Sequence, residues 1–158
     1  QHLQETLVKA AAHKGTAFIE ILQNCNIFND KAWEPVTEKA VRDERNVVLE
    51  HGKPVVFGKN REKGIRLNGF SPEIVNLGNG ITEKDLITYD ETDPSGVLAW
   101  LFSRIDYPEF PTPIGVFKNI KRPAYEDGVR AQIERAREKS GPGDLKALLN
   151  MGDTWTVK

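Results

Sequence analysis

The chain has 158 residues, of which 39% are hydrophobic and 28% charged, and its formal net charge at pH 7 is −1. This length allows one domain with a modest core, and the near-zero charge excludes the basic excess that nucleic-acid binding needs. No apolar run reaches the length of a transmembrane helix. The single cysteine excludes an internal disulfide framework and suits a reducing cytoplasm.

The first thirty residues have the pattern of a helix followed by a strand. Leu3, Leu7 and Ala10 recur at helical spacing before Gly15, so we expect a helix over residues 3–13. The near-continuous apolar run after it predicts a strand over residues 16–23, buried on both faces of a sheet. This order is typical of the last unit of a parallel α/β sheet.

After residue 30, prolines and glycines recur between short elements. The pattern predicts short strands at 47–50, 55–57, 65–70, 74–77 and 86–89, with a turn at Asn79-Gly80. Asp93 as N-cap and Pro94 as first helical residue predict a helix that ends near Arg104. Further helices are expected over 126–139 and 144–150. We therefore expect residues 31–158 to form a long mixed α+β arm without an independent compact core.

Cys25 is the first candidate functional residue. It follows the predicted strand, and open α/β sheets collect their ligands at the carboxyl ends of strands. The alternative is a structural thiol that packs as a small hydrophobic side chain. The neighbouring Asn24, Asn26 and Asn29 could donate to a ligand beside the sulfur, or they could simply shape the turn that follows the strand.

Other motifs give weaker indications of function. The stretch Gly52–Asn60 is no phosphate-binding loop, because one residue too many separates its glycines and Asn60 replaces the magnesium-binding hydroxyl. A basic cluster (Lys59, Arg61, Lys63 and Arg66) favours a solvated hairpin, with contact to an acidic partner as the alternative. The histidines have no metal-ligand spacing to one another or to Cys25. The tryptophans are interpreted as packing anchors; they are Trp33, Trp100 and Trp155.

Several segments together resemble the carboxy-terminal part of the β subunit of 2-oxoacid:ferredoxin oxidoreductases, above all the 2-oxoglutarate type. They run in register from end to end of the chain: Ala11-Ala12-His13-Lys14-Gly15-Thr16, Gln23-Asn24-Cys25-Asn26-Ile27-Phe28-Asn29-Asp30, Pro35-Val36-Thr37, Lys39-Ala40-Val41-Arg42-Asp43-Glu44-Arg45, His51-Gly52-Lys53-Pro54, Tyr89-Asp90-Glu91-Thr92-Asp93-Pro94, Phe110-Pro111-Thr112-Pro113-Ile114-Gly115-Val116-Phe117 and Gly152-Asp153-Thr154-Trp155.

The resemblance implies an α/β fold class. Residues 1–30 would be the last helix-strand unit of a thiamine diphosphate-binding domain, and residues 31–158 its carboxy-terminal arm. The family's Cys-x-x-Cys pair and its Gly-Asp-Gly motif, which holds Mg²⁺ and thiamine diphosphate, are absent. The chain also begins at Gln1 without an initiator methionine or signal-peptide pattern. These observations predict a carboxy-terminal fragment of a longer subunit.

For the site, the resemblance implies that Cys25 is the fourth ligand of a [4Fe-4S] cluster. The whole enzyme would oxidatively decarboxylate a 2-oxoacid with coenzyme A and ferredoxin, assembled with an α subunit. The fragment alone would be inactive, would hold no complete cofactor and could self-associate. The alternative is a free-standing, non-catalytic module for subunit interaction.

Overall fold

The computed structural model describes residues 1–157, which form two compact units. The first unit comprises Gln1–His13 and Ala17–Lys121, and the second comprises Lys14–Thr16 and the chain from Arg122 onward. Lys158, the last residue of the predicted arm, lies outside the described residues. No helix within residues 1–157 has the length and hydropathy to cross a bilayer.

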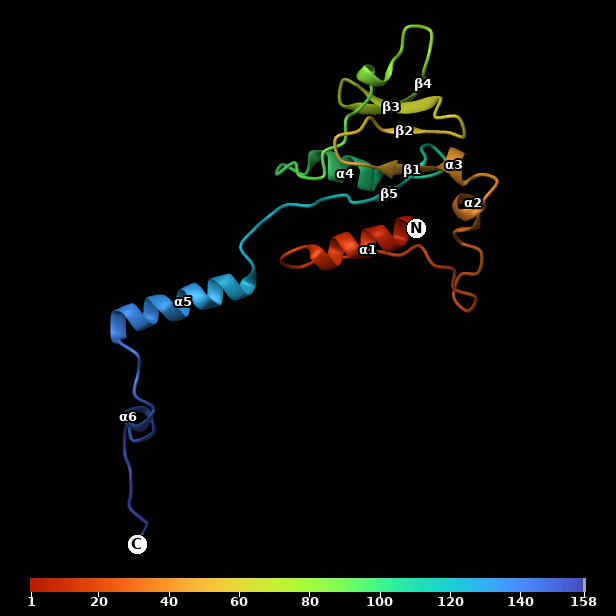
Figure 1. Cartoon of the computed structure of the whole chain (residues 1–158). Helices are drawn as coiled ribbons and strands as arrows, with labels where there is room; N and C mark the ends of the chain where they lie inside the picture. The colour runs from red at the N-terminus through yellow and green to blue at the C-terminus, as the bar shows by residue number, and fades with distance from the viewer. Residues whose placement is uncertain (158) are drawn as a thin grey trace. The chain divides into compact units, whose positions relative to one another are not determined.

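The first unit begins with helix α1, His2–Ala12, as the sequence predicts (Figure 1). His13 ends the helix in an extended conformation, and Gly15 follows with φ of 121°, a left-handed value that favours glycine. No residue of α1 is buried. The apolar stripe expected to face a core is instead open, with Leu3 47% and Leu7 41% exposed.

The strand predicted at residues 16–23 is wrong for this chain, because residues 16–24 form no strand. Phe18 is 90% exposed and Ile21 51%. A strand of a parallel sheet satisfies its backbone N–H and C=O groups through neighbouring strands. No strand among residues 1–157 pairs with this segment. The apolar run at residues 16–23 therefore has no neighbouring strands in the described part of the chain with which to form the predicted sheet.

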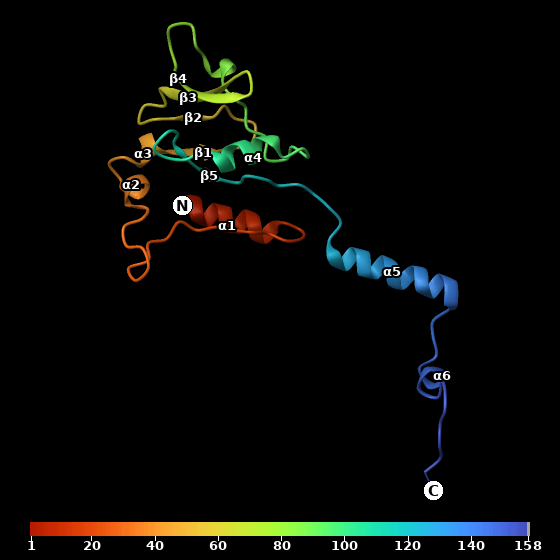
Figure 2. The same ribbon diagram turned by 180° about the vertical axis from the view of Figure 1, so that it is seen from behind.

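Two short helices and two small sheets follow, which confirms a mixed α/β fold with parallel and antiparallel pairing. The helices are α2, Glu34–Thr37, and α3, Arg42–Arg45. Strand β1, Asn46–Leu49, pairs in parallel with β5, Thr112–Gly115. The other sheet is an antiparallel meander, visible from both sides in Figures 1 and 2, of β2, Val56–Phe57, β3, Lys63–Asn68, and β4, Ser71–Asn76.

Glycine occupies a position of positive φ in two tight turns, one within this meander and one after it. β3 and β4 are joined by the two-residue loop Gly69-Phe70, in which Gly69 has φ of 64°. The predicted turn at Asn79-Gly80 is confirmed, with positive φ at both residues and hydrogen bonds in both directions between Gly78 and Ile81. The short 3₁₀ helix η1, Glu83–Asp85, follows. The strand predicted at 86–89 is reduced to one antiparallel bridge, Pro54 to Thr88.

Helix α4, Val97–Arg104, starts later than its predicted N-cap at Asp93. The Asp93 carboxylate accepts the backbone N–H of Ser95 at 2.9 Å, which closes a turn ahead of the helix. Gly96, with φ of 70°, then takes the N-cap position. Asp and Pro here shape the approach to the helix, and the predicted end at Arg104 is confirmed.

The arm contains a core of its own between the sheets and α4, contrary to expectation. The Tyr89 and Phe102 rings, both 0% exposed, meet edge to face with centroids 5.4 Å apart. The buried cluster around them comprises Val47, Leu49, Val55, Phe57, Ile65, Ile87 and Ile105. Alternating burial along β1 supplies two of these residues, so short strands with one inward face suffice to build the core.

The second unit is helical, and both of its predicted helices are confirmed. Helix α5 spans Tyr125–Ser140 and α6 spans Leu145–Leu149. Asp144 caps α6 by accepting the backbone N–H groups of Lys146 and Ala147. Neither helix contains a buried residue.

Candidate functional site

The loop that carries Cys25 is organised by the side chain of Asn24. Its Oδ1 accepts the backbone N–H of Lys31 at 2.7 Å. Its Nδ2 donates to the Oδ1 atoms of Asn26 and Asp30, each at 2.8 Å. Asn24 thus joins both ends of residues 24–31, so this amide performs the turn chemistry that was one of its two interpretations.

The Cys25 thiol lies against the backbone of its own loop. The backbone N–H groups of Phe28 and Ile27 lower the pKa of the Cys25 thiol below its ordinary value, with a smaller contribution from Asn29, whose N–H donates to the Cys25 carbonyl at 3.0 Å. The thiol is half-buried. N–H donors favour the thiolate, the form that binds metals, and the assignment of Cys25 as a ligand stays a prediction.

The chain supplies one thiol. Within residues 1–157 no three His, Cys, Asp or Glu side chains gather into a group that could hold a metal ion. An iron–sulfur cluster is usually held by four thiolates. Within the described residues the Cys25 thiol is not part of a metal-binding group.

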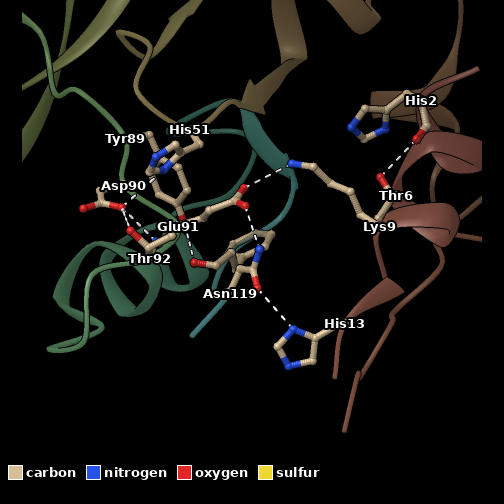
Figure 3. Close-up of polar contacts among 11 residues, drawn as sticks. His2, Thr6, Lys9, His13, His51, Tyr89, Asp90, Glu91, Thr92 and Asn119 are labelled. Carbon is tan, nitrogen blue, oxygen red and sulfur yellow. Dashed lines mark hydrogen bonds and ion pairs between the residues drawn. The ribbon is translucent and has the colours of Figure 1, made fainter. Parts of the chain in front are cut away.

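A second constellation, a polar network drawn in Figure 3, brings two of the resembling segments together. The Gly52 N–H donates to the Tyr89 carbonyl at 2.8 Å, and the Tyr89 N–H donates to the Lys53 carbonyl at 2.9 Å. His51 Nδ1 lies 3.2 Å from Asp90 Oδ1. Hydrogen bonds from the Thr92 hydroxyl and N–H, aided by His51, hold the pKa of Asp90 below its usual value.

Glu91 is the buried centre of this network, 6% exposed. Its Oε1 accepts from Asn119 Nδ2 at 3.0 Å, and its Oε2 accepts from Lys9 Nζ at 3.4 Å. Asn119 Oδ1 in turn lies 3.2 Å from Nδ1 of His13. Burial, with a smaller contribution from the Glu91 and Asp90 charges, raises the pKa of Tyr89 to about 12.

Sequence reasoning missed this network, although segments quoted for the resemblance contain most of its side chains: His13, His51, Tyr89, Asp90, Glu91 and Thr92. Those segments were the available signal. Lys9 and Asn119 carried none, because their spacing to Glu91 is set by the fold.

The basic cluster is partly neutralised. Lys63 Nζ lies 2.6 Å from Glu44 Oε2, and the Arg66 guanidinium donates to the Glu73 carboxylate across the β3–β4 pair. These pairs favour the solvated-hairpin interpretation, since they reduce the free positive charge that an acidic partner would meet.

These two ion pairs predict a loss of stability in acid. The Lys63 ammonium lowers the pKa of Glu44, and the Arg66 guanidinium lowers the pKa of Glu73, from a reference value of 4.5. Their contribution is present above that value and disappears as pH falls through the lower folded-state pKa. Denaturant titrations from pH 6 down to pH about 3 should show a weaker pH dependence in a Glu44→Gln, Glu73→Gln double variant. An unchanged slope would contradict this assignment.

The tryptophans do not anchor the core found here: Trp100 is 67% and Trp155 85% exposed. Their predicted role as anchors to other parts of an assembly stays a prediction. In the Gly52–Asn60 stretch, Val56 and Phe57 form buried strand β2. This placement agrees with the absence of a phosphate-binding loop there.

Comparison with known proteins addresses the resemblance directly. The chain is similar to a subunit of a 2-oxoacid oxidoreductase. This relative is the 2-oxoglutarate oxidoreductase subunit KorB of Mycobacterium tuberculosis, with 36% identity over 158 residues and 98% of the chain. The resemblance inferred from the motifs is confirmed. The chain spans 42% of the length of KorB. No family model and no solved structure matches the chain.

Proposed function

We propose that the chain is the carboxy-terminal part of the β subunit of a 2-oxoacid:ferredoxin oxidoreductase, with 2-oxoglutarate as substrate. The observation that carries this proposal is the similarity to KorB across 98% of the chain. The reaction would convert the 2-oxoacid and coenzyme A into an acyl-CoA and CO₂. The two electrons released would pass one at a time to ferredoxin. The enzyme would work in a reducing cytoplasm.

Within that enzyme, Cys25 would supply the fourth thiolate of a [4Fe-4S] cluster. The lowered pKa of the Cys25 thiol supports this assignment, because N–H groups stabilise a thiolate and tune a bound cluster. When bound, the cluster carries single electrons between cofactor and ferredoxin. Asn24 would serve the site indirectly, by holding the loop that positions these N–H groups.

Thiamine diphosphate and Mg²⁺ would be bound outside this chain, which has no Gly-Asp-Gly motif. Residues 1–30 would complete the thiamine diphosphate-binding domain by docking onto it. The exposed apolar side chains of this segment, including Leu7, Phe18 and Ile21, support that docking. Residues 31–158 would contact the α subunit.

A second candidate is a free-standing interaction module without chemistry. The buried core around Tyr89 and Phe102 favours it, because that part of the chain can bury apolar surface by itself. Such a module should be monomeric, or one defined oligomer, with a single cooperative unfolding transition. A separated arm should instead expose apolar surface and self-associate.

Activity measurements test the proposed function. The full-length β subunit assembled with its α subunit should reduce ferredoxin only when 2-oxoglutarate and coenzyme A are both present. Pyruvate in place of 2-oxoglutarate is the matched substrate control. The 158-residue chain alone should show no turnover. Turnover by the isolated chain, or an assembled enzyme inert toward every 2-oxoacid, would contradict the proposal.

A further inference from the structure

Helix α1 contacts the rest of the first unit through its polar side. Lys9 and His13 lie one turn apart on the same face of the helix. Both reach the same pair of residues: Lys9 contacts Glu91 directly, and His13 contacts Asn119. Because α1 has no buried residue, these polar contacts take the place of the apolar packing that normally holds a helix.

Glu91 is built into the rigid part of the unit. Tyr89, two residues earlier, is 0% exposed, and its hydroxyl donates to the Phe117 carbonyl. Two residues further along both segments, Asn119 donates its backbone N–H to the Glu91 carbonyl at 2.6 Å and its side-chain amide to the Glu91 carboxylate. These bonds join the two segments and leave the carboxylate little freedom to move.

Both carboxylate oxygens of Glu91 have partners, as a buried charge requires. One oxygen accepts from Lys9 on α1 and the other from Asn119, which relays the contact to His13. A neutral side chain of similar size could keep at most part of this arrangement. The carboxylate is thus the single group on which both contacts to α1 converge (Figure 3).

We infer that Glu91 is a positioning residue: it fixes α1 against the core and thereby sets where the chain begins its course toward Cys25. In Figures 1 and 2, the chain beyond α1 turns and runs back alongside the helix before it reaches α2. The consequence for Cys25 rests on the proposed function. The hold on α1 is independent of it.

Amide hydrogen exchange on the 158-residue chain tests the hold on α1. Glu91→Leu should accelerate exchange in α1 by about tenfold or more while β1 and β3 change by less than about twofold, because only α1 loses its partners. Glu91→Gln keeps an acceptor for Asn119 but loses the ion pair with Lys9, so it should restore only part of the protection. Asp90→Asn is the matched control, since Asp90 contacts His51 rather than α1.

Lys9→Met provides a variant that leaves the core intact, because the Lys9 side chain is 59% exposed. It should also accelerate α1 exchange, so the inference can be tested even if Glu91→Leu does not fold. Unchanged α1 exchange in Lys9→Met, or in folded Glu91→Leu, would overturn the inference whatever the role of Cys25.

The effect of Glu91 on the position of Cys25 is tested by a spectroscopic measurement on the assembled enzyme. The electron paramagnetic resonance spectrum of the reduced cluster should change in Glu91→Leu and return in part in Glu91→Gln. A loosened α1 with an unchanged spectrum would overturn this part. If Cys25→Ser kept a complete cluster, the assignment of Cys25 as a ligand would fail, and the exchange experiment would still decide whether Glu91 holds α1.

Discussion

Replacing Cys25 with serine in the full-length subunit should lower 2-oxoglutarate-dependent reduction of ferredoxin by about a hundredfold or more, because a [4Fe-4S] cluster that loses a thiolate is lost or converted. Serine keeps the size of the side chain and a hydroxyl for the loop N–H groups, so the loop itself should persist. Iron and sulfide analysis, together with the electron paramagnetic resonance spectrum of the reduced protein, measures the cluster directly under anaerobic conditions.

The matched control is Asn26→Ala, one residue further along the same loop. Asn26 accepts a single hydrogen bond, from Asn24. Its replacement by alanine therefore leaves the contacts of Asn24 with Asp30 and Lys31 in place. This variant should retain its cluster and most of its activity. Full iron content and normal turnover in Cys25→Ser would exclude Cys25 as a ligand and leave it a structural thiol.

Phe102→Ala should lower the free energy of unfolding of the chain by about 3–5 kcal/mol, the usual range for removing a buried phenylalanine ring. Phe102 is 0% exposed and its ring packs against Tyr89, so its loss leaves a cavity at the centre of the core. Urea titration monitored by circular dichroism gives the free energy, and an unchanged slope would show that the unfolding reaction itself is the same.

Trp100→Ala on the same helix separates burial from helix propensity. Trp100 is 67% exposed, so its removal should change the free energy of unfolding by about 0.5 kcal/mol or less. Equal losses from the two variants would mean that the cluster around Phe102 does not carry the stability assigned to it.

Elements with local determinants were predictable from the sequence. Helices α1, α5 and α6 have their periodicity and stop signals within the segment itself, and α6 also has its capping Asp144. The turn at Asn79-Gly80 is likewise encoded in two adjacent residues. Each of these predictions needed no knowledge of distant residues.

Elements that depend on partners were not predictable in the same way. The apolar run at 16–23 was assigned a buried strand, but burial requires neighbouring strands, and residues 1–157 provide none for it. Glu91 posed the converse problem. A lone carboxylate between Asp90 and Thr92 gives no indication of burial, because the partners that make burial tolerable lie at Lys9 and Asn119.

The candidate site was foreseen in part. Its thiol was singled out because Cys25 is the only cysteine and follows an apolar run. The organisation of its loop by Asn24 was one of two open interpretations, since an asparagine beside a cysteine suits either a turn or a ligand. Only the structure distinguishes the two interpretations, because the deciding hydrogen bonds join Asn24 to Asp30 and Lys31.

The pairing of β1 with β5 has a consequence for how the chain acquires its structure. Asn46 lies opposite Thr112, so this parallel ladder joins segments separated by 66 residues (112 − 46). The β3–β4 hairpin lies wholly between them and closes across a two-residue loop. Loop-closure entropy makes the hairpin the faster event and the parallel ladder the slower one. During synthesis, β1 must therefore wait, unpaired, until the ribosome has released Thr112–Gly115.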